Sequence, residues 1–462
     1  MAAGAYWATR GDTADYAVQR VAGTDPLLDE PNAEAIPTVN IAEPIGWAAD
    51  EVPKAAEGLK VTRFAEGLDH PRVMQRMPNG DILVTLTRSP DSEDGGGITA
   101  WIADLLMSRA GAGGTSADEL VLLRDTTGDG IADKRFVLTD ALSSPSGIAY
   151  ADGKLFVANH DAVVSFDYEI GATKIGSTPT KLMDLPAGGS HWMRNMELSP
   201  EGDKLYIAVG SVSNIGEKGM DVEQGRAAIH EYDLESGRSR IFGSGLRNPN
   251  GLDFNPWSGE LWTTVNERDM LGSDLVPDYL TNVPLGSNYG WPWFYYGDVV
   301  DKRVDAQMPQ SIVGYTRTPE FALGPHVAAL GFRFTNKGHR LGAAFGRGAV
   351  VAQHGSWNRK PASGYNVVFV AFDARGNPQG KPKPILTDFL TGTGQTRGRP
   401  TWVEWADDGA LLVTDDTAGI IWRVIAPGAK PAAANVRTQS EPLPPRSELR
   451  GDPRQAFGDT PR

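Results

Sequence analysis

Two neighbouring segments carry side chains that could bind a ligand at the edge of a rigid scaffold. Arg247 and Asn248 stand between glycines and a proline, which hold the backbone in a fixed turn. The run 261–265 has the composition of a strand, so Glu267 and Asp269 emerge together at its end. A rigid turn beside a strand end with these charges indicates the rim of a binding site. A solvated surface loop held by salt bridges is the alternative.

His191 is the histidine best placed for proton chemistry. His191 comes shortly before one strand of a repeated turn-and-strand pattern, and Arg247 holds the same position one repeat later. An imidazole titrates at about pH 6.5 and is the usual group for accepting a proton near neutral pH. The sequence therefore nominates His191 as a general base, with a purely structural histidine as the alternative.

Cationic side chains gather in two further segments. Arg397 and Arg399 are two residues apart in a strand-like stretch, so their side chains are expected to project the same way. Two guanidinium groups side by side form a fork that binds carboxylates or phosphates. Arg359 and Lys360 add two cations in another repeat. Basic residues gathered in several loops of an acidic protein indicate an anionic ligand.

A glycine-containing loop has the spacing of a cation site. Hard cations such as Ca²⁺ need six to eight oxygen ligands at short distance, and one loop can supply several of them from alternate positions. Any ion held there would be structural, and an acidic turn without a metal is the alternative. The candidate ligands are Asp125, Thr127, Asp129, Ile131 and Asp133.

The elements that must position these residues follow one recurring pattern, a polar turn with glycine and then a period-two strand. Six copies, on the order of 50–90 residues apart, predict an all-β fold, a six-bladed β-propeller with four-stranded blades and long insertions in the loops of one rim. We expect an extended N-terminal arm over 1–58, the propeller over 59–426 and a flexible Pro/Arg-rich tail over 427–462. The copies are 78–84, 152–157, 201–207, 258–262, 346–351 and 408–413.

Composition limits the partners and the compartment. The net charge of −14 argues against nucleic acid or an anionic membrane surface as a partner. The chain has no cysteine, which excludes thiolate chemistry and suits an oxidising compartment as well as the cytosol. No apolar run reaches the roughly 18 residues of a membrane span. We expect a periplasmic or secreted protein, with membrane contact only through a removed or missing N-terminal segment.

Taken together, these motifs resemble the soluble dehydrogenases that use pyrroloquinoline quinone (PQQ), most closely the L-sorbosone dehydrogenase-like branch. The likeness covers roughly residues 60–425, and the order and number of its motifs carry it. The motifs are His191 with Arg194–Asn195, 209–211 with Asn214 and Glu217, 245–249, 265–269, 275–279, 288–292, 354–359, 397–400 and Asp415–Asp416.

The resemblance implies that PQQ lies over the propeller channel. It makes His191 the general base and places Arg247 with Asn248 around the reactive quinone carbonyl. It implies that Arg397 and Arg399 hold the carboxylates of PQQ.

The resemblance also implies a calcium ion on the quinone, bound near Glu267, Asp269 and Met270. The better known glucose dehydrogenases use a Gly-Pro backbone at the position of Asp269 and Met270, so we expect side-chain carboxylates to take over the role here. Arg359 or Lys360 would replace the cofactor-binding lysine of the family.

The implied reaction is hydride transfer from an aldose, or from a sorbosone-like aldehyde, to PQQ, giving a lactone or an acid. An external cytochrome or quinone would accept the electrons. The family carries an Asp where Ser211 stands and a Gln where only Ser144 or Ser146 is near, which leaves the partner of the histidine base and the substrate open. A calcium-dependent lactone hydrolase and a non-catalytic binding propeller are the rival functions.

Overall fold

The computed structural model describes residues 11–34, 37–90, 114–335 and 338–432. Most of the predicted tail, from residue 433 on, lies outside this part of the chain. In the described residues the regular structure is β-strand, apart from three short 3₁₀ helices, η1 (Val18–Arg20), η2 (Gln310–Ile312) and η3 (Ala343–Phe345). None of the helices described is long and apolar enough to cross a membrane.

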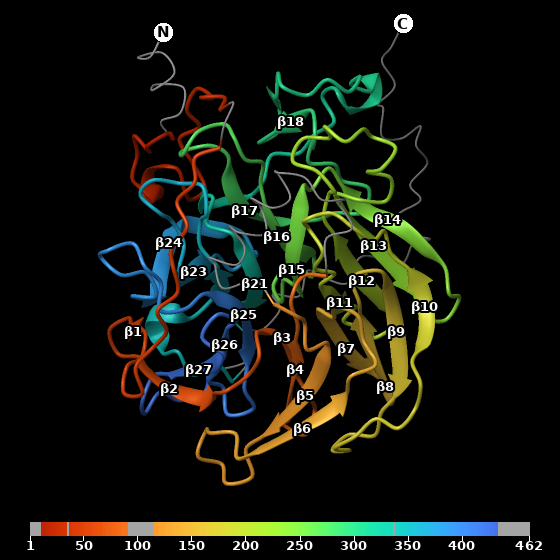
Figure 1. Cartoon of the computed structure of the whole chain (residues 1–462), viewed down its shortest axis with the longest axis vertical. Coiled ribbons are helices and arrows are strands. Elements are labelled where there is room, and N and C mark those ends of the chain that lie inside the picture. The colour runs from red at the N-terminus through yellow and green to blue at the C-terminus, as the bar shows by residue number, and fades with distance from the viewer. Residues whose placement is uncertain (1–10, 35–36, 91–113, 336–337, 433–462) are drawn as a thin grey trace, which may run out of the picture.

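Six antiparallel sheets surround a common centre, with β3, β7, β11, β15, β21 and β25 innermost (Figure 1). From the innermost strand outward, the first blade is β3 (Pro71–Arg76), β4 (Ile82–Leu86), β5 (Glu119–Arg124) and β6 (Lys134–Thr139). The second blade is β7 (Gly147–Ala151), β8 (Lys154–Ala158), β9 (Ala162–Asp167) and β10 (Thr180–Asp184). The third blade is β11 (Met196–Leu198), β12 (Lys204–Val209), β13 (Ala228–Asp233) and β14 (Ser239–Ser244). The fourth blade is β15 (Asn248–Phe254), β16 (Leu261–Asn266), β17 (Pro277–Asn282) and β20 (Phe321–Pro325). The fifth blade is β21 (Ala329–Phe334), β22 (Gly348–Gln353), β23 (Asn366–Phe372) and β24 (Pro378–Thr387). The sixth blade is β25 (Pro400–Trp405), β26 (Leu411–Asp415), β27 (Ile420–Ile425) and β2 (Lys60–Ala65).

The predicted six-bladed propeller is confirmed, and each predicted repeat is the hairpin between the first and second strand of one blade. The last blade takes its outermost strand, β2, from the start of the chain. Its pairing with β27, with Val61 opposite Val424, closes the ring. Closure leaves a propeller with only short, protected sheet edges.

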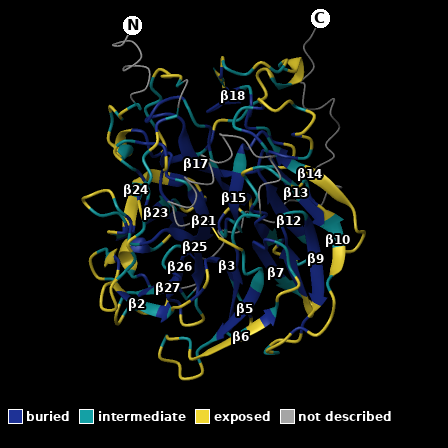
Figure 2. Cartoon of the chain, viewed as in Figure 1, coloured by how far each residue is buried: buried dark blue, intermediate teal, exposed yellow. Residues whose placement is uncertain are grey.

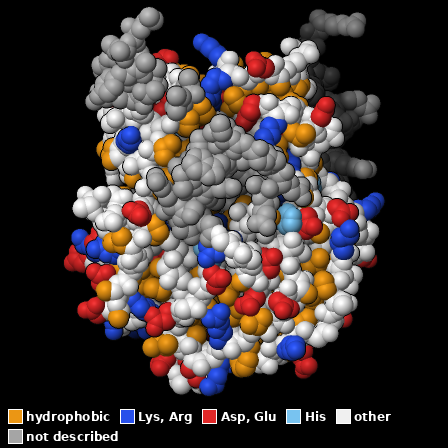
Figure 3. All heavy atoms as spheres, in the orientation of Figure 1, with side chains coloured by type: hydrophobic (Ala, Val, Ile, Leu, Met, Phe, Trp, Pro, Cys, Tyr) orange, Lys and Arg blue, Asp and Glu red, His pale blue; other side chains and the backbone are white. Residues whose placement is uncertain are grey.

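The core lies between adjacent blades. The inner and middle strands are mostly buried, whereas the outer strands β6, β10 and β14 are mostly exposed or half-buried (Figure 2). Trp262, Trp402 and Trp422 are among the largest fully buried side chains and pack in three separate clusters. On the outer surface seen in Figure 3, acidic and basic side chains are interspersed.

The described part of the predicted arm runs against the propeller. The short strand β1 (Lys54–Ala55) extends the fifth blade beyond β24, with Lys54 opposite Thr387. Isolated bridges join Gly23 to Ala322 and Pro44 to Thr396. A further hairpin, β18 (Phe294–Tyr295) and β19 (Val299–Val300), lies in the long insertion between β17 and β20.

Candidate active site

Blade topology brings the candidate residues to one face of the propeller. In a four-stranded antiparallel blade, the loop from the second to the third strand and the loop to the next blade leave from the same face. The former loops carry Ser211, Asn214, Glu267, Asp269, Met270, His354, Asn358, Arg359, Lys360 and Asp416, and the latter carry His70, His191, Arg247, His326, Arg397 and Arg399.

His191 is anchored in a defined orientation by Ser211. Its Nδ1 lies 2.8 Å from the Ser211 carbonyl oxygen and 3.1 Å from Ser211 Oγ, which itself donates to the Ser213 carbonyl. Nδ1 must carry the proton to donate to a carbonyl, so Nε2 keeps its lone pair. Burial, with the nearby Arg247 cation, lowers the pKa of His191 to about 3. Ser211 therefore orients the histidine, a role that the sequence left without a residue.

Gly210 allows His191 and Asn248 to approach each other. A Cβ atom at position 210 would lie 2.6 Å from the His191 Cβ and still closer to Asn248 Oδ1. Asn248 is the first residue of β15, and its amide lies 3.4 Å from Asn266 Oδ1. The two predicted site residues thus meet across a glycine.

Arg247 is buried, and its hydrogen-bond donors are all used within the protein. Nε and Nη2 donate to the carbonyl oxygen and Oδ1 of Asn214, at 3.2 and 2.9 Å. Nη1 donates to the carbonyls of Asn266 and Glu267, and Nη2 also contacts Asp269 Oδ2 at 2.9 Å. With its five N–H groups engaged, Arg247 positions the loops around it and supplies positive charge.

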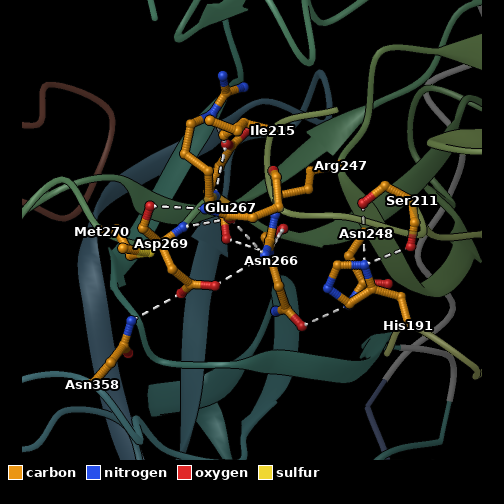
Figure 4. Close-up of polar contacts among 12 residues, drawn as sticks. His191, Ser211, Ile215, Arg247, Asn248, Asn266, Glu267, Asp269, Met270 and Asn358 are labelled. Carbon is orange, nitrogen blue, oxygen red and sulfur yellow. Dashed lines mark hydrogen bonds and ion pairs between the residues drawn. The ribbon is translucent and has the colours of Figure 1, made fainter. Parts of the chain in front are cut away.

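The Asp269 carboxylate is the centre of the polar network in Figure 4. Its Oδ2 pairs with Arg247, and its Oδ1 accepts from Asn358 Nδ2 at 2.9 Å and lies 3.6 Å from His326 Nδ1. Burial alone would raise the pKa of this carboxyl, but Arg247 and the histidines His326 and His191 hold it well below its usual range. Burial alone would lower the pKa of His326, whereas Asp269 raises it above its usual value. Asp269 is therefore ionised beside the Arg247 cation.

The predicted calcium ligands do not converge. The Glu267 side chain is buried and its Oε2 accepts from Arg268 Nε at 2.9 Å, away from Asp269. The carbonyls of Asp269 and Met270 both accept from Arg303 Nη1, each at 2.9 Å. Among the residues that the structure describes, no three His, Cys, Asp or Glu side chains form a group able to hold a metal.

The predicted cations of 359–360 also differ from expectation. Arg359 is buried, and it donates to the carbonyls of Tyr16, Ser273 and Pro361 and pairs with Asp274 at 2.9 Å. Arg359 therefore attaches the N-terminal arm to the rim, and its guanidinium group is directed at protein groups and not at a ligand. Lys360 lies beside it, partly buried, on the same loop.

Arg397 and Arg399 do not form the predicted fork. The stretch before β25 is not a strand, so the two side chains take different directions. Arg397 lies over the Trp47 ring and 3.6 Å from Glu51, toward the arm. Arg399 is buried over the Tyr365 ring, with Nη2 3.3 Å from the Tyr365 hydroxyl and Nε without a partner. Of these two arginines, only Arg399 keeps an unpartnered donor in a buried position.

A second buried cluster surrounds Asp416 on the same face. Its Oδ2 lies 2.9 Å from His354 Nε2, 3.4 Å from His70 Nε2 and within an ion pair with Arg72. Burial alone would raise the pKa of Asp416, but these partners hold it far below its usual range. Burial lowers the pKa of His70 to about 4 and lowers that of His354, to which Arg399 also contributes. Three segments distant in sequence build this cluster. Asp416 and the motif that begins at His354 were named from the sequence but were not joined.

The acidic loop between β5 and β6 lies on the opposite face, because it joins the third and fourth strands of its blade. Asp125 accepts from the backbone N–H groups of Thr127, Gly128 and Gly130, and Asp129 accepts from Ile131. The two oxygens of Asp133 accept from Thr126. Calcium binding by this loop stays a prediction.

Comparison with known proteins places the chain among carbohydrate-active relatives. The family described as TrAA12-like matches residues 53–283 and 297–426. The PQQ-dependent pyranose dehydrogenase of Coprinopsis cinerea is 26% identical over 438 residues, covering 81% of this chain and 55% of that protein. The aldose sugar dehydrogenase YliI of Escherichia coli is 36% identical over 104 residues, 22% of this chain and 26% of that protein.

Solved structures share the fold. The holo form of the PQQ domain of the Coprinopsis cinerea pyranose dehydrogenase superposes with a TM-score of 0.64 at 22% identity, covering 83% of this chain and all (100%) of that one. A family AA12 enzyme from Trichoderma reesei gives a TM-score of 0.64 at 20% identity, covering 80% of this chain and 97% of that one. The chain spans about half the length of the curated pyranose dehydrogenase, in line with a match to its PQQ domain.

Proposed function

The chain belongs to the TrAA12-like family, within the PQQ-dependent soluble sugar dehydrogenases, and on this premise we propose that it oxidises a sugar with PQQ as cofactor. The observation that carries the proposal is His191, whose Nδ1 is anchored on Ser211 and whose Nε2 is left as a base on the face that gathers the cationic loops. The relatives are named for pyranoses and aldose sugars. An aldose is therefore the proposed substrate class, and a sorbosone-like aldehyde is its alternative.

The donors on this face fit an anionic quinone. The Arg399 Nε donor is buried without a partner, and the Asn358 Oδ1 acceptor beside the Asp269 network is also unpartnered. Arg399 would hold a carboxylate of PQQ, with Asn248 and Asn358 contacting its polar edge. When bound, PQQ supplies a two-electron acceptor for the hydride of the substrate carbon.

The residues of the chain supply the rest of the chemistry. His191 Nε2 removes the proton of the substrate hydroxyl, which raises electron density at the carbon that loses hydride. The proton then resides on His191, whose low pKa beside Arg247 favours its release to water. Arg247, locked by five hydrogen bonds, adds a fixed positive field without reorganisation.

One arrangement favours this proposal over a lactone hydrolase with a metal in the channel. The inward-facing carboxylates Glu197 and Glu404 both pair with Arg333, at 2.5 and 3.2 Å, and Arg333 also donates to the Leu252 carbonyl. A guanidinium thus holds the central position among the channel carboxylates.

Reconstitution tests the proposal. We expect chelator-treated protein supplied with PQQ and calcium to reduce an artificial dye when given pyranoses, other aldoses or sorbosone. Tight PQQ binding without turnover would move the substrate outside this panel, and no PQQ binding would refute the proposal.

We further propose a periplasmic or secreted location, which the cysteine-free sequence suits. We also propose a cytochrome or a quinone as the physiological electron acceptor.

A further inference from the structure

The groups that the sequence nominates as calcium ligands are already used by positively charged side chains. Arg268 occupies the Glu267 carboxylate, and Arg247 pairs with the Asp269 carboxylate. The carbonyls of Asp269 and Met270, which correspond to the Gly-Pro pair of the resembling family, converge on one nitrogen, Arg303 Nη1. Their lone pairs therefore face a cation that belongs to the protein.

Arg303 is held in this place from its other side. Its Nε and Nη2 form a two-pronged contact with Asp301, at 2.9 and 2.7 Å, and the Asp301 carboxylate is almost fully buried and also lies 3.4 Å from Arg268 Nη1. A bidentate pair of this kind fixes a guanidinium in both position and orientation. The two hydrogens of Arg303 Nη1 are donated to the two carbonyl oxygens. This nitrogen therefore bridges the two oxygens, as a bound metal ion would.

A calcium ion at these carbonyls would require the departure of Arg303. Calcium needs oxygens within about 2.3–2.6 Å, and it would stand against a fixed positive charge at the same lone pairs. We propose that Arg303 takes the place of the calcium ion in this site, and that the chain binds PQQ without calcium. The inference rests on the proposed function, and the experiment below separates the two.

The test is equilibrium titration of purified protein with PQQ, followed by the absorbance of the quinone, in excess chelator and in excess calcium. The two dissociation constants are expected to agree within about twofold. Binding that is lost in chelator and restored by calcium would overturn the inference and leave the proposed function intact. Binding in neither condition would refute the proposed function and the inference with it.

Substitution of the arginine gives the converse result. Arg303→Gln is expected to weaken PQQ binding in chelator at least about tenfold and to make it respond to added calcium. Arg303→Lys retains the charge and is expected to stay calcium-independent, which covers the case in which the glutamine variant fails to fold. Arg240→Gln, on the exposed outer strand β14, serves as the matched control with unchanged binding. Calcium-independent binding of wild-type strength in Arg303→Gln would overturn the role of this residue.

Discussion

Replacement of His191 by alanine separates proton removal from cofactor binding. The side-chain hydrogen bonds of His191 go to Ser211, and none goes to Arg399 or to the Asp269 carboxylate. The substitution therefore removes Nε2 as a base and leaves the cationic groups in place. We expect the dissociation constant for PQQ to change by no more than about twofold.

The expected loss of rate follows from the role of the base. General-base catalysis contributes about 10²–10⁴-fold, which corresponds to about 3–5 kcal/mol in the activation free energy. Burial and Arg247 hold the pKa of His191 at about 3, so Nε2 is unprotonated at every pH well above that value. The base is active in this neutral form. The wild-type kcat should therefore show no acid limb near the usual histidine value and should fall only toward pH 3.

Steady-state dye reduction across pH measures both effects, and added imidazole should partly restore the rate of His191→Ala. His160→Ala is the matched control, because His160 lies on the same rim but contacts only the Ser143 region and Asp161. The reasoning is refuted if His191→Ala keeps wild-type kcat with normal PQQ binding. An acid limb near neutral pH that disappears in His191→Ala would also contradict the lowered pKa.

Three further outcomes are expected. Arg399→Ala should weaken PQQ binding at least about tenfold in a titration, while Arg397→Ala should leave it nearly unchanged, because only Arg399 has a buried, unpartnered donor. Arg333→Met should lower the free energy of unfolding by about 3–5 kcal/mol in denaturant melts, since it leaves Glu197 and its neighbours buried without their cation. Burial raises the pKa of Asp253 to about 7, so the native state keeps a proton that the unfolded state releases above about pH 4; this contribution to stability should be lost as pH rises from about 4 to 7, and Asp253→Asn should make the fall shallower in thermal melts.

The fold was predictable because its signal is local. Each blade begins with a hairpin whose turn residues and period-two pattern stand within about ten residues of sequence, as in the repeat before Leu261 and the repeat before Leu411. The rim position of His191 and Arg247 followed from the same repeats. Counting strands from a hairpin also places the connecting loops on one face.

Side-chain direction on the rim was not predictable in the same way. The alternation rule that joined Arg397 with Arg399 applies to a strand, and this segment is an irregular loop. Arg359 and Glu267 were nominated for charge, yet contacts remote in sequence decide their orientation. Arg359 donates to the Tyr16 carbonyl, and Glu267 accepts from its neighbour Arg268, which is itself held by the carbonyls of Pro292 and Phe294. The resemblance pointed to position 211, but the serine there gave no signal of its own, because an orienting carbonyl can come from any residue type.

The N-terminal arm belongs to the construction of the site. The arm residues Glu34 and Asn32 donate their backbone N–H groups to the carbonyls of Met270 and Leu271, and Arg359 returns a hydrogen bond to the Tyr16 carbonyl. These contacts fix the loops that carry Asp269 and Asn358 from outside, while Arg247 and Arg303 fix the first of them from within. Loops on a propeller rim are otherwise free to move, so a site whose donors must be held to fractions of an ångström needs both attachments. The N-terminal arm and the two arginines Arg247 and Arg303 therefore both hold the rim loops rigid around His191.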